Sequence, residues 1–127
     1  MKPELISLTP SEWRVMELLW QGDATLMELV HALGEQAGWA KSTVSTMVRR
    51  MEDKGLIGHT EHGRAKLFHA NLRREEVAIA ETESLLSRVY HGSVGLMVNT
   101  LLQRGRLTRN DLEELQSILQ QAEEETT

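Results

Sequence analysis

Apolar residues recur at helical spacing near the start of the chain: Trp13, Met16, Leu19 and Trp20. Intervals of three and four residues predict an amphipathic helix, and Gly22 marks its end. Its beginning is also marked, because Thr9 is placed as N-cap, Pro10 as first helical residue and Glu12 as the capping-box glutamate. The sequence therefore predicts a helix from about residue 10 to Gly22.

A second capping box follows at Thr25 and Glu28. The stripe behind it contains Leu33 with either Met27 and Val30 or Leu29, and the helix ends at Gly34 or Gly38. A third helix is predicted from about Lys41 to Lys54, followed by Gly55 as a left-handed stop. Its core face has four apolar residues: Val44, Met47, Val48 and Met51. Three short helices with tight connections predict a helix-turn-helix.

Two strands are predicted next, at about 57–61 and 66–70, around the turn His62-Gly63-Arg64. Further helices are expected at about 73–90, 93–104 and 108–123, separated by glycines. The predicted fold is mainly α with a small β wing. We expect a winged helix-turn-helix DNA-binding domain in residues 1–71 and a C-terminal helical dimerisation domain in residues 72–127.

Composition narrows the classes of function. With 127 residues and no cysteine, the chain has no disulfide framework, no thiol catalysis and no cysteine-bound metal. No apolar run approaches the roughly 20 residues that span a membrane, so we expect a cytoplasmic protein with no membrane partner. The sequence contains no glycine-rich phosphate loop, no Ser/His/Asp order and no HExxH motif. We expect neither an enzyme nor a bound cofactor.

The net charge of −5 is unevenly distributed. Residues 1–70 have eight basic and nine acidic side chains, whereas residues 71–127 have six and ten. Within 41–66 there are six basic and three acidic side chains, a local excess of three positive charges. Since phosphate contact depends on the local field, this segment is the candidate docking surface for a polyanion.

The face of the third helix opposite its core stripe is rich in hydroxyls and arginines: Ser42, Thr43, Ser45, Thr46, Arg49 and Arg50. Small hydroxyls allow close approach to a major groove, and arginine can bond guanine bidentately. Serine and threonine are indifferent helix formers, so four of them in five positions indicate that this face has a function beyond forming the helix. We predict that this face reads DNA, that Lys41 and Arg64 contact the backbone, and that Arg64 and Lys66 form a basic wing.

Other interpretations remain open at this level. A hydroxyl-rich face can simply be solvated, and two charges on a hairpin can serve solubility alone. Trp39 either closes the core, which we favour, or contacts the DNA backbone. His59, His62 and His69 could make a metal- or ligand-responsive regulator, although no metal site is predicted. A winged helix can also serve as a protein-interaction module.

The C-terminal helices have apolar stripes that a complete winged helix does not need. Those assigned to dimerisation are Val94, Met97, Val98, Leu101, Leu102, Leu112, Leu115, Ile118 and Leu119. A two-fold copy of the chain is the simplest surface to cover them. The alternative is that the helices fold back on their own chain.

Taken together, these motifs resemble the penicillinase-repressor family of winged-helix transcription factors. The matching residues are Leu8, Ser11-Glu12-Trp13, Val15-Met16, Trp20, Trp39, Lys41, Thr43-Val44, Thr46-Met47, Arg50, Lys54-Gly55, Gly63-Arg64, Asn71, Tyr90-His91-Gly92-Ser93, Met97-Val98 and Asp111-Leu112-Glu113-Glu114-Leu115. They are distributed over nearly the whole chain.

The resemblance implies a cytoplasmic homodimer that represses transcription by occluding a promoter at a pseudo-palindromic operator. In penicillinase-type members, a sensor protease inactivates the repressor by cutting an Asn-Phe pair after the Met-Val, so a regulatory protease is an implied partner. The corresponding place here reads Asn99-Thr100-Leu101, which departs from that pair. Copper-type members use paired cysteine motifs, which this chain lacks.

Overall fold

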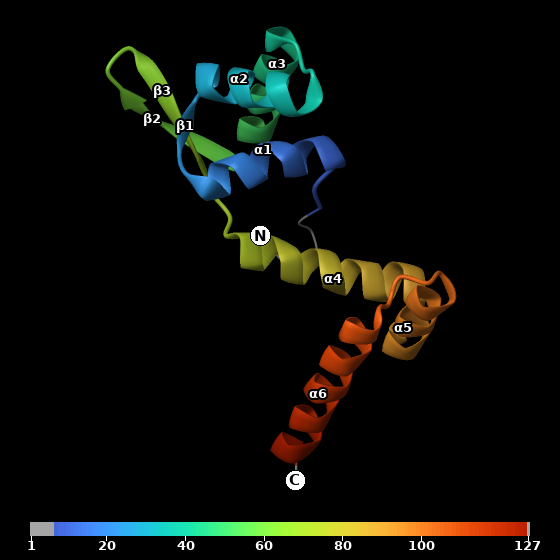
Figure 1. Cartoon of the computed structure of the whole chain (residues 1–127). Coiled ribbons are helices and arrows are strands. Elements are labelled where there is room, and N and C mark those ends of the chain that lie inside the picture. Colours follow the sequence, from blue (N-terminus) through green and yellow to red (C-terminus); the bar gives the residue numbers. More distant parts are fainter. Residues whose placement is uncertain (1–6, 127) are drawn as a thin grey trace. The chain divides into compact units, whose positions relative to one another are not determined.

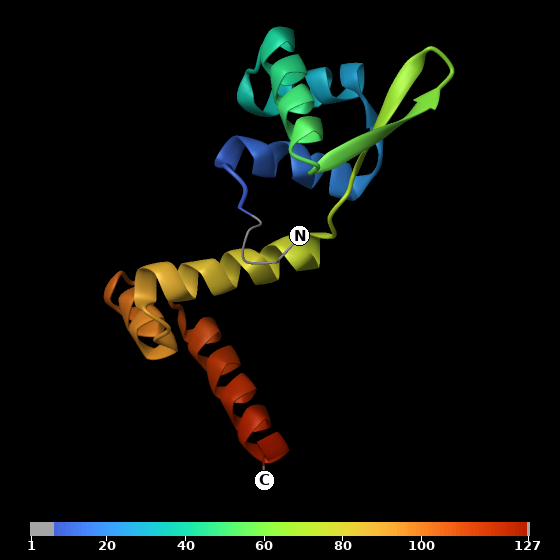
Figure 2. The same cartoon turned by 180° about the vertical axis from the view of Figure 1, so that it is seen from behind.

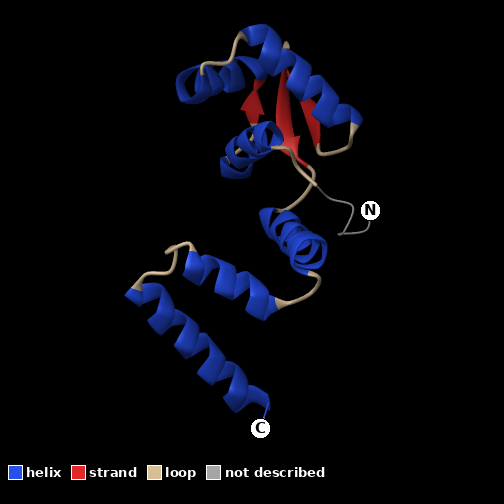
Figure 3. Cartoon of the chain, turned by 90° about the vertical axis from the view of Figure 1, so that its right-hand side faces the viewer, coloured by secondary structure: helices blue, strands red, loops and turns tan. Residues whose placement is uncertain are grey.

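The computed structural model describes residues 7–126, which form six helices and one three-stranded sheet (Figures 1 and 3). The chain divides into two compact units, one ending at Glu83 and the other starting at Ser84. The elements of the first are α1 (Pro10–Gln21), β1 (Ala24–Thr25), α2 (Leu26–Ala37), α3 (Lys41–Asp53), β2 (Ile57–His62), β3 (Ala65–Ala70) and the start of α4 (Arg74–Tyr90). The second contains the end of α4, α5 (Val94–Gln103) and α6 (Arg109–Thr126). The predicted fold class, mainly α with a small β wing, is confirmed.

Both predicted capping boxes are present. Glu12 N donates to Thr9 Oγ1 at 3.1 Å, and Thr9 N donates to Glu12 Oε1 at 2.9 Å. At α2, Glu28 N donates to Thr25 Oγ1 at 3.2 Å, and Thr25 N donates to Glu28 Oε1 at 2.9 Å. Each box satisfies backbone donors that the first helical turn leaves without a helical partner. Of the two predicted ends of α2, Gly38 is the correct one, with a φ of 68°.

The end of α3 determines how the chain enters the wing. Gly55 adopts a φ of +82°, and the amide of Leu56 donates to Met51 O at 3.0 Å. The amide of Gly55 donates to Glu52 O at 2.9 Å, so the two bonds form a Schellman motif. Leu56 and Met51 are both buried, which fixes the direction in which β2 leaves the helix.

The sheet has the strand order β1-β3-β2, and both pairings are antiparallel. The predicted hairpin is confirmed, with Ile57 opposite Ala70 and His62 opposite Ala65. Strand β1, which pairs Thr25 with Leu67, is not among the predicted elements. A two-residue strand has no periodicity of its own, because its pairing depends on a strand some forty residues away in the chain.

The core of the first unit contains residues from all three helices, the sheet and α4. Its buried apolar residues are Leu8, Val15, Met16, Leu19, Leu29, Leu33, Val44, Val48, Met51, Leu56, Ile57, Phe68, Val77 and Ala80. In the stripe predicted for α3, Met47 is only partly buried. Trp39 is partly buried against the same core, as the favoured interpretation required. Figure 2 shows α3 beside α1 and the wing hairpin extending away from them.

The start of α4 packs with the winged helix, since Val77 and Ala80 are buried in its core. The first compact unit therefore extends to Glu83, beyond the predicted domain boundary after residue 71. A division of function between residues 1–71 and 72–127 stays a prediction.

The second unit is arranged differently. No residue of α5 or α6 is buried, although each helix has an apolar stripe. A groove of about 350 Å³, here named the C-terminal groove, lies between them and is lined by Met97, Val98, Leu101, Leu107, Asp111, Glu114, Leu115 and Ile118. Among residues 7–126, no helix has both the length and the apolar content that crossing a bilayer requires.

Candidate nucleic-acid interface

Helix α3 presents a polar face because its buried residues share one side. Val44, Val48 and Met51 face the core, while Lys41, Ser42, Thr43, Arg49 and Arg50 are exposed and Ser45 and Thr46 are half-buried. The hydroxyls lie in the first half of the helix and the arginines in the second. All the α3 residues predicted to contact DNA are therefore accessible to a partner.

A groove of about 580 Å³, here named the wing groove, lies between α3, the start of α2 and the wing. Its polar and charged lining residues are Thr25, Ser45, Arg49, Glu52, Arg64 and Lys66, and its apolar ones are Leu26, Met27, Val48, Ala65 and Phe68. Four of the nine predicted DNA contacts thus border one concave surface. Three of those four are cations.

Strand alternation explains how the wing contributes to this groove. Lys66 and Phe68 are two residues apart on β3, so their side chains point to the same face of the hairpin. Phe68 is buried against the core, and Lys66 is exposed one step farther out. Arg64 lies in the turn, next to Gly63 at a φ of +66°. The wing therefore has an apolar base and a cationic tip on the side that faces α3.

The remaining α3 residues border a second hollow. This outer hollow, of about 280 Å³, is lined by Ser42, Thr43, Thr46, Met47 and Arg50. Lys41 lines neither hollow among the residues described. The α3 residues predicted to contact DNA thus border two hollows, one shared with the wing and one lined by α3 alone.

Met27 also lines the wing groove, although the sequence did not predict it there. Its side chain is 58% exposed in the wing groove, whereas Leu29 and Leu33 take the buried stripe of α2. The sequence left two apolar stripes open for α2, one with Met27 and one with Leu29, and a count of apolar positions does not distinguish them. On a helical wheel, Met27 points away from Leu29 and Leu33, and that direction is the signal for its exposure.

A polar contact joins the wing to α3. His59 Nδ1 lies 2.5 Å from Glu52 Oε2, and His59 Nε2 lies 3.7 Å from Glu61 Oε1. The His59 ring also packs edge-on against Phe68, with centroids 5.7 Å apart. These contacts hold β2 against the second half of α3 and engage the one carboxylate that lines the wing groove.

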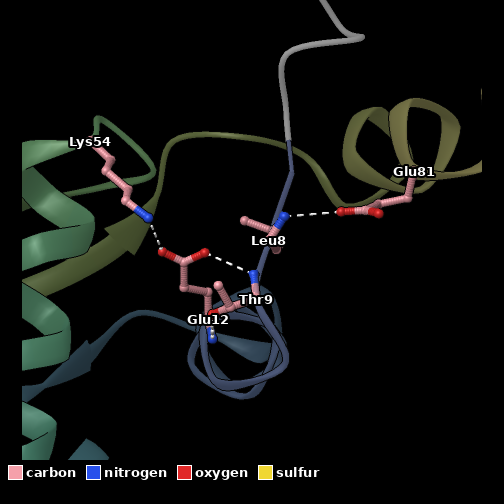
Figure 4. Close-up of polar contacts among 5 residues, drawn as sticks. All are labelled: Leu8, Thr9, Glu12, Lys54 and Glu81. Atoms are coloured by element: carbon pink, nitrogen blue, oxygen red, sulfur yellow. Dashed lines mark hydrogen bonds and ion pairs between the residues drawn. The ribbon is translucent and has the colours of Figure 1, made fainter. Parts of the chain in front are cut away.

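The C-terminal end of α3 is held by a second contact (Figure 4). Lys54 Nζ donates to Glu12 Oε2 at 2.6 Å, while Glu12 Oε1 accepts from Thr9 N. Glu12 is 3% exposed, and among residues 7–126 it is the one polar or charged residue that is buried. Burial raises the pKa of Glu12, but the hydrogen bonds from Lys54 and Thr9 outweigh it, so that pKa lies below its ordinary value.

The wing histidines do not converge. Gly58 is opposite His69 and His59 is opposite Phe68, so His59 and His69 point to opposite faces of the hairpin. His62 shares a face with His69 but is paired four residues farther along the strand, a separation of about 13 Å. Within residues 7–126, no three His, Cys, Asp or Glu side chains are close enough to hold a metal ion.

Comparison with known proteins extends this description. A protein-family model described as penicillinase repressor matches residues 8–121. The penicillinase repressor of Bacillus licheniformis is 26% identical over 115 residues, which are 90% of this chain and 90% of that protein. The methicillin resistance regulatory protein MecI of Staphylococcus aureus strain N315 is 21% identical over 113 residues, 88% of this chain and 92% of that protein. The solution structure of the DNA-binding domain of the repressor BlaI has a TM-score of 0.50 and 26% identity, covering 59% of this chain and 90% of that one.

Proposed function

The chain belongs to the penicillinase-repressor family, and on that premise we propose that it holds a pseudo-palindromic operator as a two-fold homodimer. The family consists of winged-helix, DNA-binding transcriptional repressors, which are not enzymes. Each protomer would place its α3 in a major groove and its wing on the adjacent backbone. Binding over a promoter would then block transcription.

The wing groove is the observation that carries this proposal. It brings Ser45 and Arg49 of α3 together with Arg64 and Lys66 of the wing, four residues selected from the sequence as DNA contacts. The whole chain has a net charge of −5, so this cationic surface would favour one orientation of a polyanion over others. A solvated face would not need cations from two separate elements around one groove.

Dimerisation is supported by the surface of the second unit. Six of the nine residues assigned to it are at least 38% exposed: Val94, Leu101, Leu102, Leu112, Ile118 and Leu119. Met97, Val98 and Leu115 are half-buried and line the C-terminal groove. Large apolar side chains exposed on two neighbouring helices favour an interaction surface, and a second copy of the chain is the partner that every copy has available.

Two finer parts of the proposal come from the family resemblance. We place the protein in the cytoplasm, where its operator would be. A regulatory protease would release it from DNA, acting near Asn99-Thr100-Leu101 in α5. Thr100 Oγ1 donates to Leu96 O at 2.9 Å inside that helix, so cutting there requires α5 to open locally.

Binding to a duplex from the chain's own upstream region, measured by fluorescence anisotropy over a range of salt, tests the proposal. We expect tight binding whose logarithm falls linearly with the logarithm of salt concentration. Arg64→Ala should weaken binding by a similar factor on every duplex and lower the salt slope by about one, because it removes a phosphate contact.

Arg14→Ala is the matched control, since Arg14 is exposed on α1 outside both hollows. Its affinity and salt slope should equal those of the wild type. A wild-type chain that binds the upstream duplex no more tightly than unrelated DNA contradicts the proposed function. A change of base preference alone in Arg64→Ala contradicts the assignment of the wing.

A further inference from the structure

We infer that Arg74 and Glu81 are positioning residues that hold α4 on the winged helix and thereby set the half-site spacing that the repressor accepts. This inference rests on the proposed homodimer and adds a determinant of specificity that touches no DNA. A series of contacts runs along one face of α4.

Arg74 makes the first contact, at the start of the helix. Its Nε lies 3.0 Å from Glu17 Oε1 on α1. Its guanidinium carbon lies 6.0 Å from the ring centroids of both Trp13 and Trp20, which is cation–π distance. The two indoles contact each other edge-on with centroids 5.6 Å apart. One cation is therefore held by a carboxylate and two aromatic rings of the same helix.

Trp20 reinforces this attachment from the other side. Its indole Nε1 donates to Leu72 O at 2.7 Å, which fixes the segment that leads from β3 into α4. Trp20 thus contacts Arg74 through its ring and the preceding segment through its N–H. The start of α4 is tied to α1 at two points only two residues apart in the chain.

Glu81 makes the last contact (Figure 4). Its Oε1 accepts from the backbone amide of Leu8 at 3.0 Å. The buried Val77 lies between Arg74 and Glu81, and the intervals of three and four residues put all three on one face of the helix. Contacts on successive turns oppose both tilting and rolling of α4 on its support.

The same support also carries the recognition helix. Leu8, which donates to Glu81, precedes Thr9, and the amide of Thr9 donates to Glu12. Glu12 in turn accepts from Lys54 at the end of α3. A continuous path of backbone and polar contacts therefore runs from the end of α3 through the start of α1 to the middle of α4.

Helix α4 continues without a break to Tyr90, past the end of the first unit at Glu83. Its course through the unit boundary makes it the covalent connection between the DNA-reading face and the proposed dimer surfaces. In a two-fold dimer, half-sites repeat with the helical turn of about 10–10.5 base pairs. A firmly held α4 would accept one spacing, whereas a loosened one would accept several.

The experiment uses the full chain and a palindromic duplex that the wild type selects from a randomised pool. The duplex is then lengthened at its centre by one, two and five base pairs. The variant is Arg74→Ala/Glu81→Ala. Arg74 is 55% exposed and its partner Glu17 is 44% exposed, so the change leaves no charge buried without a partner.

Two controls accompany it. Arg73→Ala removes an exposed arginine that directly precedes α4 and whose ion pair, at 3.2 Å to Glu76, reaches only the first turn of that helix. Glu81→Gln keeps an oxygen that can accept the hydrogen bond of the Leu8 amide. Both should behave as the wild type. Thermal melting of every variant checks that it is folded.

We expect the wild type to bind the lengthened duplexes about 10- to 100-fold more weakly than the selected one, comparable to the effect of a mismatched base pair. In Arg74→Ala/Glu81→Ala this factor should fall to about threefold or less, with affinity for an isolated half-site unchanged. A merely structural role would weaken binding to all spacings equally, and that result would overturn the inference.

Two further results are decisive. A double variant that keeps the wild-type factor overturns the inference, and so does a wild type that selects a palindrome but tolerates every spacing. If the wild type selects no duplex, or sediments as a monomer when it binds one, the proposed function itself is wrong. The two failures are therefore distinguishable in one set of measurements.

Discussion

Arg49 and Arg50 are adjacent in the chain, yet they border different surfaces of α3. Consecutive helical residues are about 100° apart, so Arg49 turns into the wing groove and Arg50 into the outer hollow. Arg49 lines the same groove as Arg64 and Lys66, a set of cations suited to phosphate. Arg50 lies among hydroxyls, a combination suited to base edges. Removing one arginine or the other should therefore change DNA binding in different ways.

Arg50→Ala should weaken binding to the selected duplex by about 1–3 kcal/mol and relax the preference at a single base position, because a bidentate base contact is lost. Arg49→Ala is the matched variant and should lower affinity for all sequences alike, with a smaller salt slope. Binding of both variants to a panel of single-base substitutions of the duplex measures the difference. Unchanged affinity of Arg50→Ala at moderate salt would contradict the assignment of α3 as the reading helix.

Glu12 is a residue whose charge state affects the stability of the fold. Since its folded pKa lies below its unfolded pKa, the stabilisation is present above the unfolded pKa and is lost as pH falls through the folded one. Glu12→Gln should reduce the free energy of unfolding at pH 7 by about 1.5–3 kcal/mol, the range for a hydrogen bond to a charged group.

The gap between wild type and Glu12→Gln should narrow as pH falls below about 4.3, the ordinary pKa of a glutamate. Urea unfolding at fixed protein concentration, repeated between pH 7 and pH 3, measures it. Glu76→Gln is the comparison variant at an exposed site. The pKa of Glu76 is also lowered, by hydrogen bonds from the backbone and side chain of Arg73. A gap for Glu12→Gln that stays constant down to pH 3 would show that its ionisation is not what stabilises the fold.

At the scale of elements, the stop of α3 depends on backbone conformation rather than on space. A Cβ added at Gly55 or at Gly22 would meet no atom within 4 Å. Gly55 has a φ of +82°, where a side chain is strained, whereas Gly22 has a φ of 164°, an extended conformation that any residue adopts. Gly55 after α3 is therefore required by its backbone conformation, whereas the conformation of Gly22 after α1 does not require glycine.

Gly55→Ala should destabilise the chain by about 1–2 kcal/mol, the cost of a left-handed conformation for an L-residue. Gly22→Ala should be neutral or stabilising by up to about 1 kcal/mol, since it reduces the freedom of the unfolded chain. Urea unfolding of both variants at one protein concentration makes the comparison. Equal effects would mean that strain at Gly55 does not govern the end of α3.

Thr25 shows how one residue can serve two elements. It caps α2 through Glu28 and also pairs with Leu67 of β3. The start of α2 is therefore positioned by the wing strand, and Met27 lines the wing groove that Lys66 also lines. A capping box specifies where a helix begins, and the strand pairing specifies where that beginning lies in space.

At the scale of the whole molecule, the double variant Ile118→Glu/Leu119→Glu should be monomeric at micromolar concentration. Ile118 and Leu119 are 53% and 61% exposed, so the change adds charge to the proposed dimer surface without disturbing a core. Loss of the second half-site should weaken operator binding by about 10²- to 10⁴-fold, the usual gain from linking two binding events. Sedimentation and anisotropy measure the two effects.

Met27→Glu is the control for that experiment, since Met27 is 58% exposed but lies in the first unit. It should stay dimeric while losing affinity for DNA, because it adds an acidic group to the wing groove. If Ile118→Glu/Leu119→Glu remains a dimer, another surface of the chain joins the two copies.

Much of this architecture follows from short stretches of sequence. Thr9 with Glu12 and Thr25 with Glu28 specify two helix starts, and Gly55 specifies an end, because each signal acts within one helical turn. The alternation at Lys66 and Phe68 similarly predicts a wing strand. The hydroxyls and arginines of α3 could be selected as DNA contacts from composition and spacing alone, and that selection stays a prediction for experiment.

The amino-acid sequence by itself determined the helices, the wing and the cationic segment, since capping, periodicity and charge depend on neighbouring residues. The family was indicated by the resemblance of motifs along the chain. Only the tertiary structure decided that Arg49 joins the wing while Arg50 does not, and that Thr25 pairs with Leu67. It also decided that Arg74 packs on α1. These contacts join residues far apart in the chain, and such contacts depend on how whole elements pack, which no local pattern encodes.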